Sequence, residues 1–150
     1  MGHTYSRILI HVIFSTAGRK NLLAENYRNR LYEYMSGIAR NEFGHAPCIG
    51  GTANHIHGVL SLNPIHSVSE AMRKWKCLSS RWLHETFPAM EGFAWQEGYG
   101  AFSVSESNVE QVRRYIENQA KHHQTISLED EFIGFLTRHG VDYDPKRVLN

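Results

Sequence analysis

The sequence has few cysteines and no long apolar run. Only two cysteines occur in 150 residues, Cys48 and Cys77, outside any C-x-x-C spacing. Neither a disulfide framework nor a cysteine zinc site is therefore indicated, and we expect both thiols in the core. No run approaches the roughly 18 apolar residues that a membrane helix needs, and the N-terminal stretch lacks a signal-peptide cleavage site. We expect a mature cytoplasmic chain with no membrane partner.

The chain also lacks a strong net charge and the common nucleotide-binding motifs. Its formal net charge is +1, whereas nucleic-acid-binding proteins often carry a large positive excess. It has no Gly-rich phosphate loop, no nucleophile-elbow serine and no recognisable catalytic Cys/His pair. These absences argue against a nucleotide cofactor and against the commonest hydrolase classes. The length and the ordinary 41% hydrophobic fraction predict one globular domain over residues 1–150.

The apolar pattern predicts an α+β fold. The first expected strand places Ile10, Val12 and Phe14 on one face and His11 and Ile13 on the other. The expected elements are a strand at 5–16, a helix around 27–38, strands at 46–52 and 55–62, a helix at 68–87, a strand at 99–105, and helices at 107–122 and 127–138. This order fits a ferredoxin-like four-stranded antiparallel sheet with helices on one face. The last two helices are additions, and a capping box at 107–110 is expected to start the first of them.

Histidine is plentiful, and two of the ten form the motif His55-Ile56-His57. On a strand both imidazoles lie on one face while Ile56 lies on the core side, so two nitrogen ligands converge. With this many histidines about 0.7 such pairs are expected by chance, so the motif alone is a weak signal. Two half-exposed strand histidines are the alternative.

Tyr115 and Gln119 lie four residues apart on the helix expected at 107–122 and therefore reach the same side. An amide oxygen can bind a hard cation. A phenol, with a pKa of about 10, becomes a useful nucleophile when a divalent cation favours the phenolate. The ordinary structural alternative is a boundary tyrosine whose hydroxyl meets water.

Basic residues occur in two of the expected helices. In the first, Trp75 and Trp82 lie on the apolar stripe and are expected in the core, while the intervening basic residues could line a groove for single-stranded nucleic acid. In the second, two arginines directly precede Tyr115, where a phosphate would arrive. The candidate DNA contacts are Arg73, Lys74, Lys76, Arg81, Arg113 and Arg114. Surface solvation explains these residues equally well.

Two polar stretches follow the tyrosine helix. Adjacent His122 and His123 would point about 100 degrees apart, so both cannot easily serve one metal. Glu129-Asp130-Glu131 follows Ser127, and we interpret it as a solvated first helical turn that the helix dipole favours.

Several segments together resemble the HUH single-tyrosine transposases of the insertion-sequence 200/605 group. The resemblance runs from Phe14-Ser15-Thr16 to the closing 139–144 segment. It is carried by Asn54-His55-Ile56-His57, the 95–105 segment WQEGYGAFSVS and Tyr115-Ile116-Glu117-Asn118-Gln119. It implies that His55 and His57 are the HUH pair, that Gln119 is the third metal ligand, and that Tyr115 is the nucleophile.

The resemblance also implies an activity. Members of this family are dimers that recognise DNA hairpins near the ends of a mobile element. They cut and rejoin single-stranded DNA through a 5′-phosphotyrosine bond with Mg²⁺ or Mn²⁺. In many of them the tyrosine helix of one subunit completes the active site of the other. Reversal of the step by another 3′-hydroxyl joins strands without ATP, which agrees with the absence of an ATP-binding motif.

Three other functions remain open from the sequence. The first is a domesticated HUH endonuclease that acts on repeated chromosomal hairpins, which side-chain chemistry cannot separate from a transposase. The second is a non-catalytic nucleic-acid-binding module on the same fold, which predicts binding that survives Tyr115→Phe without a covalent adduct. The third is a zinc-dependent phosphoesterase with water as the nucleophile, which predicts hydrolysis without Tyr115.

Overall fold

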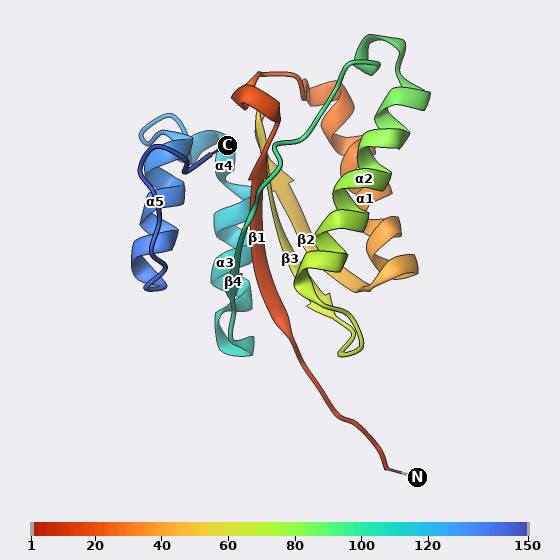
Figure 1. Cartoon of the computed structure of the whole chain (residues 1–150), viewed down its shortest axis with the longest axis vertical. Helices are drawn as coiled ribbons and strands as arrows, with labels where there is room; N and C mark the ends of the chain where they lie inside the picture. Colours follow the sequence, from red (N-terminus) through yellow and green to blue (C-terminus); the bar gives the residue numbers. More distant parts are fainter. Residues whose placement is uncertain (1, 150) are drawn as a thin grey trace.

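A four-stranded antiparallel sheet forms the centre of the computed structural model, which describes residues 2–149 (Figure 1). The strands are β1 (Leu9–Ser15), β2 (Gly44–Gly51), β3 (His55–Leu62) and β4 (Gly100–Ser103), in the order β2-β3-β1-β4. β1 pairs with β3 along its whole length, so that Ser15 lies opposite His55. The expected hairpin and the ferredoxin-like strand order are confirmed.

One face of the sheet is covered by α1 (Glu25–Glu42) and α2 (Val68–Thr86) (Figure 1). The apolar residues of β1 and β3 meet both helices here in one large core. Trp75 is fully buried in it, and its indole N–H donates to the carbonyl oxygen of Met35 at 2.8 Å. A Cβ at Gly58 would lie 2.7 Å from the Trp75 ring, so glycine allows this close packing. Trp75 is thus a core residue, as expected.

The opposite face is covered by α3 (Val109–Glu117), α4 (Gln119–His122) and α5 (Leu128–Arg138), which lie together on the other side of the sheet (Figure 1). Two smaller apolar clusters hold this layer. One joins Ile13 and Phe102 to α5, and the other joins Val59 to Ile116 of α3. Gly50 lets α3 approach β2 closely, because a Cβ there would lie 2.7 Å from the Ile116 carbonyl oxygen.

The helix expected at 107–122 differs from the expectation in two ways. It is divided at Asn118, whose φ of −98° and ψ of 19° are not helical, so Gln119 begins a new short helix. The expected capping box does not form. A 3-10 turn at Glu106–Asn108 precedes α3, and the Ser107 hydroxyl bonds the Ser105 hydroxyl at 3.1 Å rather than the helix backbone.

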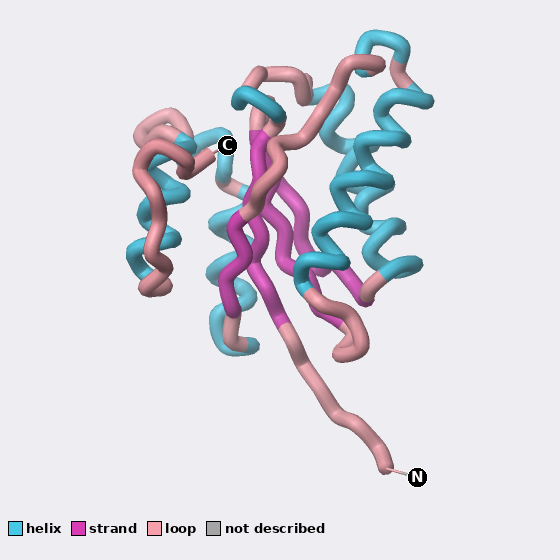
Figure 2. Tube along the Cα trace, viewed as in Figure 1, coloured by secondary structure: helices cyan, strands magenta, loops and turns pink. Residues whose placement is uncertain are grey.

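The remaining segments are mostly loops (Figure 2), with two further 3-10 turns at Ala17–Arg19 and Pro88–Met90. Cys48 is buried as expected, but Cys77 is exposed on α2, so its expected place in the core was wrong. No helix among residues 2–149 has both the length and the apolar character needed to cross a bilayer. The final segment returns to the sheet, where Leu149 packs into the α5 cluster.

Candidate metal and tyrosine site

The two histidines of β3 lie beneath the helical layer formed by α3, α4 and α5. Strand alternation directs His55 and His57 to this side and Ile56 to the opposite core, as the sequence predicted. The side chains of His55 and His57 are 1% and 0% exposed. The alternative of two half-exposed strand histidines was therefore wrong.

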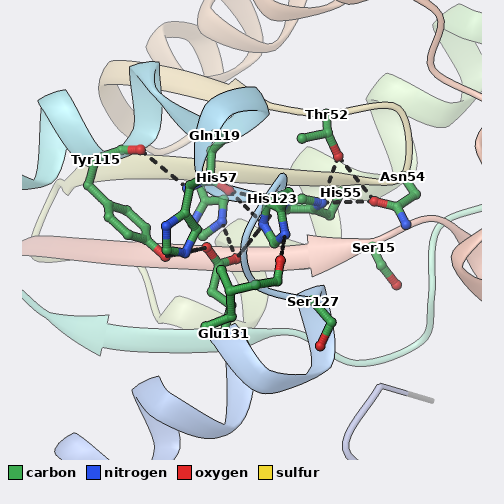
Figure 3. Close-up of polar contacts among 12 residues, drawn as sticks. Ser15, Thr52, Asn54, His55, His57, Tyr115, Gln119, His123, Ser127 and Glu131 are labelled. Carbon is green, nitrogen blue, oxygen red and sulfur yellow. Dashed lines mark hydrogen bonds and ion pairs between the residues drawn. The ribbon is translucent and has the colours of Figure 1, made fainter.

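His55 is fixed by hydrogen bonds at both ring nitrogens (Figure 3). Its Nδ1 lies 2.9 Å from the Thr52 hydroxyl and 2.9 Å from the Asn54 side-chain oxygen. Its Nε2 lies 3.0 Å from Oε1 of Gln119. Burial, together with the smaller effect of the nearby His57, lowers the pKa of His55 to about 3. The ring is therefore neutral at physiological pH, the form in which imidazole binds a metal.

His57 lies between a second buried histidine and a carboxylate. Its Nδ1 is 2.8 Å from Nε2 of His11 in β1, and its Nε2 is 2.9 Å from Oε1 of Glu131. Burial lowers the pKa of His57. Burial is also the largest cause that lowers the pKa of His11, which falls to about 3. His11 thus holds one nitrogen of His57 and leaves the other facing the centre of the cluster.

Gln119 enters the cluster at the start of α4. Its Oε1 lies 3.0 Å from Nε2 of His55 and 3.0 Å from Nε2 of His123, while its amide nitrogen donates to the Tyr115 carbonyl oxygen. The break at Asn118 separates the two helices between Tyr115 and Gln119. The structure thus brings together His55, His57, Tyr115 and Gln119, the four site residues expected from the sequence.

The Tyr115 side chain points into the same cluster (Figure 3). Its hydroxyl donates to Oε2 of Glu131 and lies 3.2 Å from Nε2 of His122. Its ring centroid is 5.7 Å from that of His57 and 5.7 Å from that of Phe135. Burial, followed by the hydrogen bond to Glu131, raises the pKa of the phenol far above its ordinary value. Without a cation nearby, the hydroxyl is therefore protonated at neutral pH.

Glu131 is the functional candidate that sequence interpretation missed. It was expected in a solvated turn, and Glu129 and Asp130 are indeed exposed, but Glu131 is only 2% exposed. Ser127 caps α5 as the pattern indicated, accepting from the Asp130 backbone N–H. Burial alone would raise the pKa of Glu131, but its contacts with His57, above all the hydrogen bond, outweigh burial and hold that pKa well below its ordinary value. The group is an ionised carboxylate inside the molecule.

The cluster fits a divalent cation. One ligand atom from each of His55, His57, His123 and Glu131 lies within 4.8 Å of the others. Ligands about 2.1 Å from one small ion lie roughly 3 to 4 Å apart, so little movement would be needed to hold an ion. Imidazole nitrogens and a carboxylate oxygen are ordinary ligands for such ions. His122 does not belong to this set, which agrees with the expectation that two adjacent histidines do not serve one metal.

The six basic candidates are divided between the two sides of the sheet. Four lie on α2, where Lys76 donates to the carbonyl oxygens of Glu97 and Gly98. The other two lie on α3. Arg113 donates to the Pro47 carbonyl oxygen at 3.1 Å. Exposed Arg114, together with Tyr115, lines a cavity of about 630 Å³. Arg114 is thus the basic candidate that shares a cavity with Tyr115.

Known proteins resemble this chain in sequence and in fold. The sequence profile described as Transposase IS200 like matches residues 4–119. The ISDra2 transposase TnpA of Deinococcus radiodurans is 24% identical over 123 residues, which cover 79% of this chain and 87% of that protein. The matched profile ends at Gln119, so His123 and Glu131 lie beyond it.

Two solved structures share the fold. One is a Deinococcus radiodurans R1 crystal structure provisionally assigned as a transposase. It has a TM-score of 0.61 at 25% identity and covers 79% of this chain and 96% of that one. The other is a REP-associated tyrosine transposase bound to a REP hairpin. It has a TM-score of 0.61 at 12% identity and covers 84% of this chain and 74% of that one. Because the profile matches well over half of the sequence, the chain belongs to the IS200-like transposase family.

Proposed function

We propose that this chain cuts and rejoins single-stranded DNA with Tyr115 as the nucleophile and a divalent metal as cofactor. One observation carries the proposal: the Tyr115 hydroxyl points at a buried cluster of metal-binding side chains within the same chain (Figure 3). The family supports DNA as the substrate.

His55, His57 and Gln119 are proposed to hold the cation, Mg²⁺ or Mn²⁺. Buried, neutral imidazoles offer lone pairs at physiological pH, and the Gln119 oxygen already faces two of the ring nitrogens. When bound, such a cation would stabilise negative charge on a phosphate and favour the phenolate form of a nearby tyrosine. His11 and Thr52 would keep the two strand imidazoles in orientation through their other nitrogens.

Tyr115 would carry the covalent step. Its oxygen loses a proton and bonds to phosphorus, the bond from phosphorus to the 3′ oxygen breaks, and that oxygen takes up a proton to leave as a 3′-hydroxyl. The product is a 5′-phosphotyrosine, which conserves the phosphoester. Another 3′-hydroxyl can therefore reverse the step and join strands without a nucleotide cofactor.

The cavity beside Tyr115 is the proposed entry for the scissile phosphate. Arg114 and Lys121 line it, and cationic side chains beside a nucleophile favour the approach of an anionic strand. Five other basic residues stay candidate DNA contacts: Arg113 on α3 and, for DNA that reaches the α2 side, Arg73, Lys74, Lys76 and Arg81.

We further propose a homodimer in which each Tyr115 serves its own chain, because the tyrosine already lies at its own histidines.

The DNA partner is proposed to contain a hairpin. The REP-associated relative binds a REP hairpin, and this observation also favours a second candidate function, a host enzyme acting on repeated chromosomal hairpins. The chemistry is the same in both cases. Hairpins that flank the gene itself would favour a mobile element, and hairpins scattered through the chromosome would favour the host enzyme.

The test is to incubate the protein with end-labelled single-stranded DNA from its own locus and separate the products on a denaturing gel. With Mn²⁺ we expect a covalent protein–DNA band that is absent with EDTA and at least about 100-fold weaker in Tyr115→Phe. Tyr143→Phe is the control, because Tyr143 is an exposed tyrosine outside the cluster. Tight binding of the same DNA without any band would favour the non-catalytic module, and DNA hydrolysis that survives Tyr115→Phe would favour the phosphoesterase.

A further inference from the structure

The carboxylate of Glu131 lies where an apolar side chain would be expected. On α5 the residues Leu128, Phe132 and Phe135 form the stripe that faces the sheet, and Glu131 lies on the same side. Carboxylates are almost never fully buried unless they are paired. Among residues 2–149, this carboxylate forms ion pairs with histidines alone: His55, His57, His122 and His123.

The two oxygens of Glu131 face different groups. Oε1 lies 2.9 Å from Nε2 of His57 and 3.2 Å from Nε2 of His123, on the side of the candidate metal ligands. Oε2 accepts the hydrogen bond of Tyr115 and lies 3.2 Å from Nε2 of His122. A single side chain thus joins the metal-binding cluster to the candidate nucleophile (Figure 3).

We propose that Glu131 is the anionic ligand of the metal centre through Oε1 and the positioning residue for Tyr115 through Oε2. This inference rests on the proposed function. Imidazoles and an amide oxygen are neutral, so without Glu131 a divalent cation would be buried with no opposite charge. A carboxylate supplies that charge and is the ligand type that Mg²⁺ and Mn²⁺ prefer over nitrogen.

The hydrogen bonds alone do not require a carboxylate at this position. A glutamine at this position could still offer an oxygen to Tyr115 or to a ring nitrogen, without the cost of burying a carboxylate. A buried carboxylate in place of an amide is explained if a cation completes the cluster. Since Glu131 lies beyond residues 4–119, which match the family profile, this role is inferred from the contacts in this chain.

The first test is Mn²⁺ titration of the full chain without DNA, followed by electron paramagnetic resonance of free Mn²⁺. We expect Glu131→Gln to weaken Mn²⁺ binding at least about tenfold and Glu131→Asp to recover part of the loss. Glu129→Gln is the matched control, because Glu129 lies in the same helical turn but is exposed. Binding by Glu131→Gln within twofold of the wild type would overturn the ligand role.

The positioning role is tested by adduct formation at saturating Mn²⁺. There the Glu131→Gln variant is expected to react at least about tenfold more slowly than wild type, and Glu131→Asp to be intermediate. A wild-type rate in Glu131→Gln would overturn the positioning role while leaving the proposed function intact. Conversely, Glu131-dependent Mn²⁺ binding with no adduct in wild type would contradict the proposed function and support the ligand role.

A measurement on the unaltered protein covers the case in which Glu131→Gln does not fold. Wild-type chain labelled with ¹³C at the glutamate carboxyl carbons is titrated with diamagnetic Cd²⁺ and followed by nuclear magnetic resonance. We expect one glutamate carboxyl signal to shift at one equivalent while the signals of exposed glutamates stay in place. Binding of Cd²⁺ at the histidines with no shifted glutamate signal would overturn the proposal.

Discussion

The two faces of the sheet are formed by the same strands but bury different kinds of side chain. On β3, Ile56 and Leu60 point into one continuous apolar core under α1 and α2. From the same strand, His55 and His57 point into a layer where polar side chains separate two smaller apolar clusters. We interpret the first layer as the part that stabilises the fold and the second as the part that holds the proposed reactive groups together at a cost in stability.

The largest effect on stability is expected from acid, because it acts on the buried histidines of the second layer and not on the apolar core. His11 and His55 have folded pKa values of about 3, below the unfolded value of 6.5, so protonation favours the unfolded chain. Their contribution to stability is complete above pH 6.5 and is lost as the pH falls toward 3, at about 1.4 kcal/mol per pH unit for each proton. Urea unfolding between pH 7 and pH 4 measures this slope. A flat profile would show that these rings are not held neutral.

Truncation in the apolar layer is expected to have the next largest effect. Trp75→Ala removes a fully buried indole and its hydrogen bond to Met35, and should lower the free energy of unfolding by about 3 to 5 kcal/mol. The molecules that remain folded should still bind Mn²⁺ like wild type. A Mn²⁺ titration, corrected for the folded fraction determined by urea unfolding, measures this. Weakened Mn²⁺ binding in the folded fraction would break the proposed division between the faces.

In the second layer, replacing a pair of polar residues with apolar ones should cost little stability but should abolish Mn²⁺ binding. His57→Leu leaves Glu131 without one partner and should cost about 1 to 3 kcal/mol, whereas His57→Leu combined with Glu131→Leu should recover most of that loss. Both variants should lose Mn²⁺ binding. Thermal and urea unfolding of the single and double variants measure the difference. A double variant less stable than the single one would mean that the polar cluster stabilises the fold.

The smallest effects are expected at two glycines that form a matched pair. Gly58→Ala would press on Trp75 in the first layer, and Gly50→Ala would press on Ile116 in the second. Each should cost about 1 to 3 kcal/mol through overpacking. Because α3 carries Tyr115, only Gly50→Ala should also slow adduct formation. Equal adduct rates in the two variants would show that the position of α3 does not control the tyrosine.

Alternation in the sequence predicted which strand residues face which layer, and it placed His55 and His57 together. It did not reveal the carboxylate, because an acidic residue in the first turn of a helix ordinarily lies in water beside the helix dipole. A signal was nevertheless present. Glu131 falls on the apolar stripe of its helix, and His11 falls between Leu9 and Ile13 on the buried side of its strand. Both Glu131 and His11 are polar residues at positions that the pattern assigns to the core, and this mismatch could have identified them as functional candidates.

The break at Asn118 and the close approach of α3 to β2 could not be predicted from helical periodicity. They depend on contacts between segments far apart in sequence, such as Ile116 against Gly50. The family resemblance named Gln119 without explaining how it reaches the histidines. The structure supplies that explanation, because a new helix begins at Gln119 and directs its oxygen toward His55.

Identification of the modified residue would show whether Tyr115 is the nucleophile. After reaction with Mn²⁺ and single-stranded DNA, the protein is digested and the nucleotide-bearing peptide is sequenced by mass spectrometry. The chain has seven tyrosines, and we expect the nucleotide to be attached to Tyr115 alone. Attachment to another residue, or complete conversion of the DNA without any modified peptide, would contradict it.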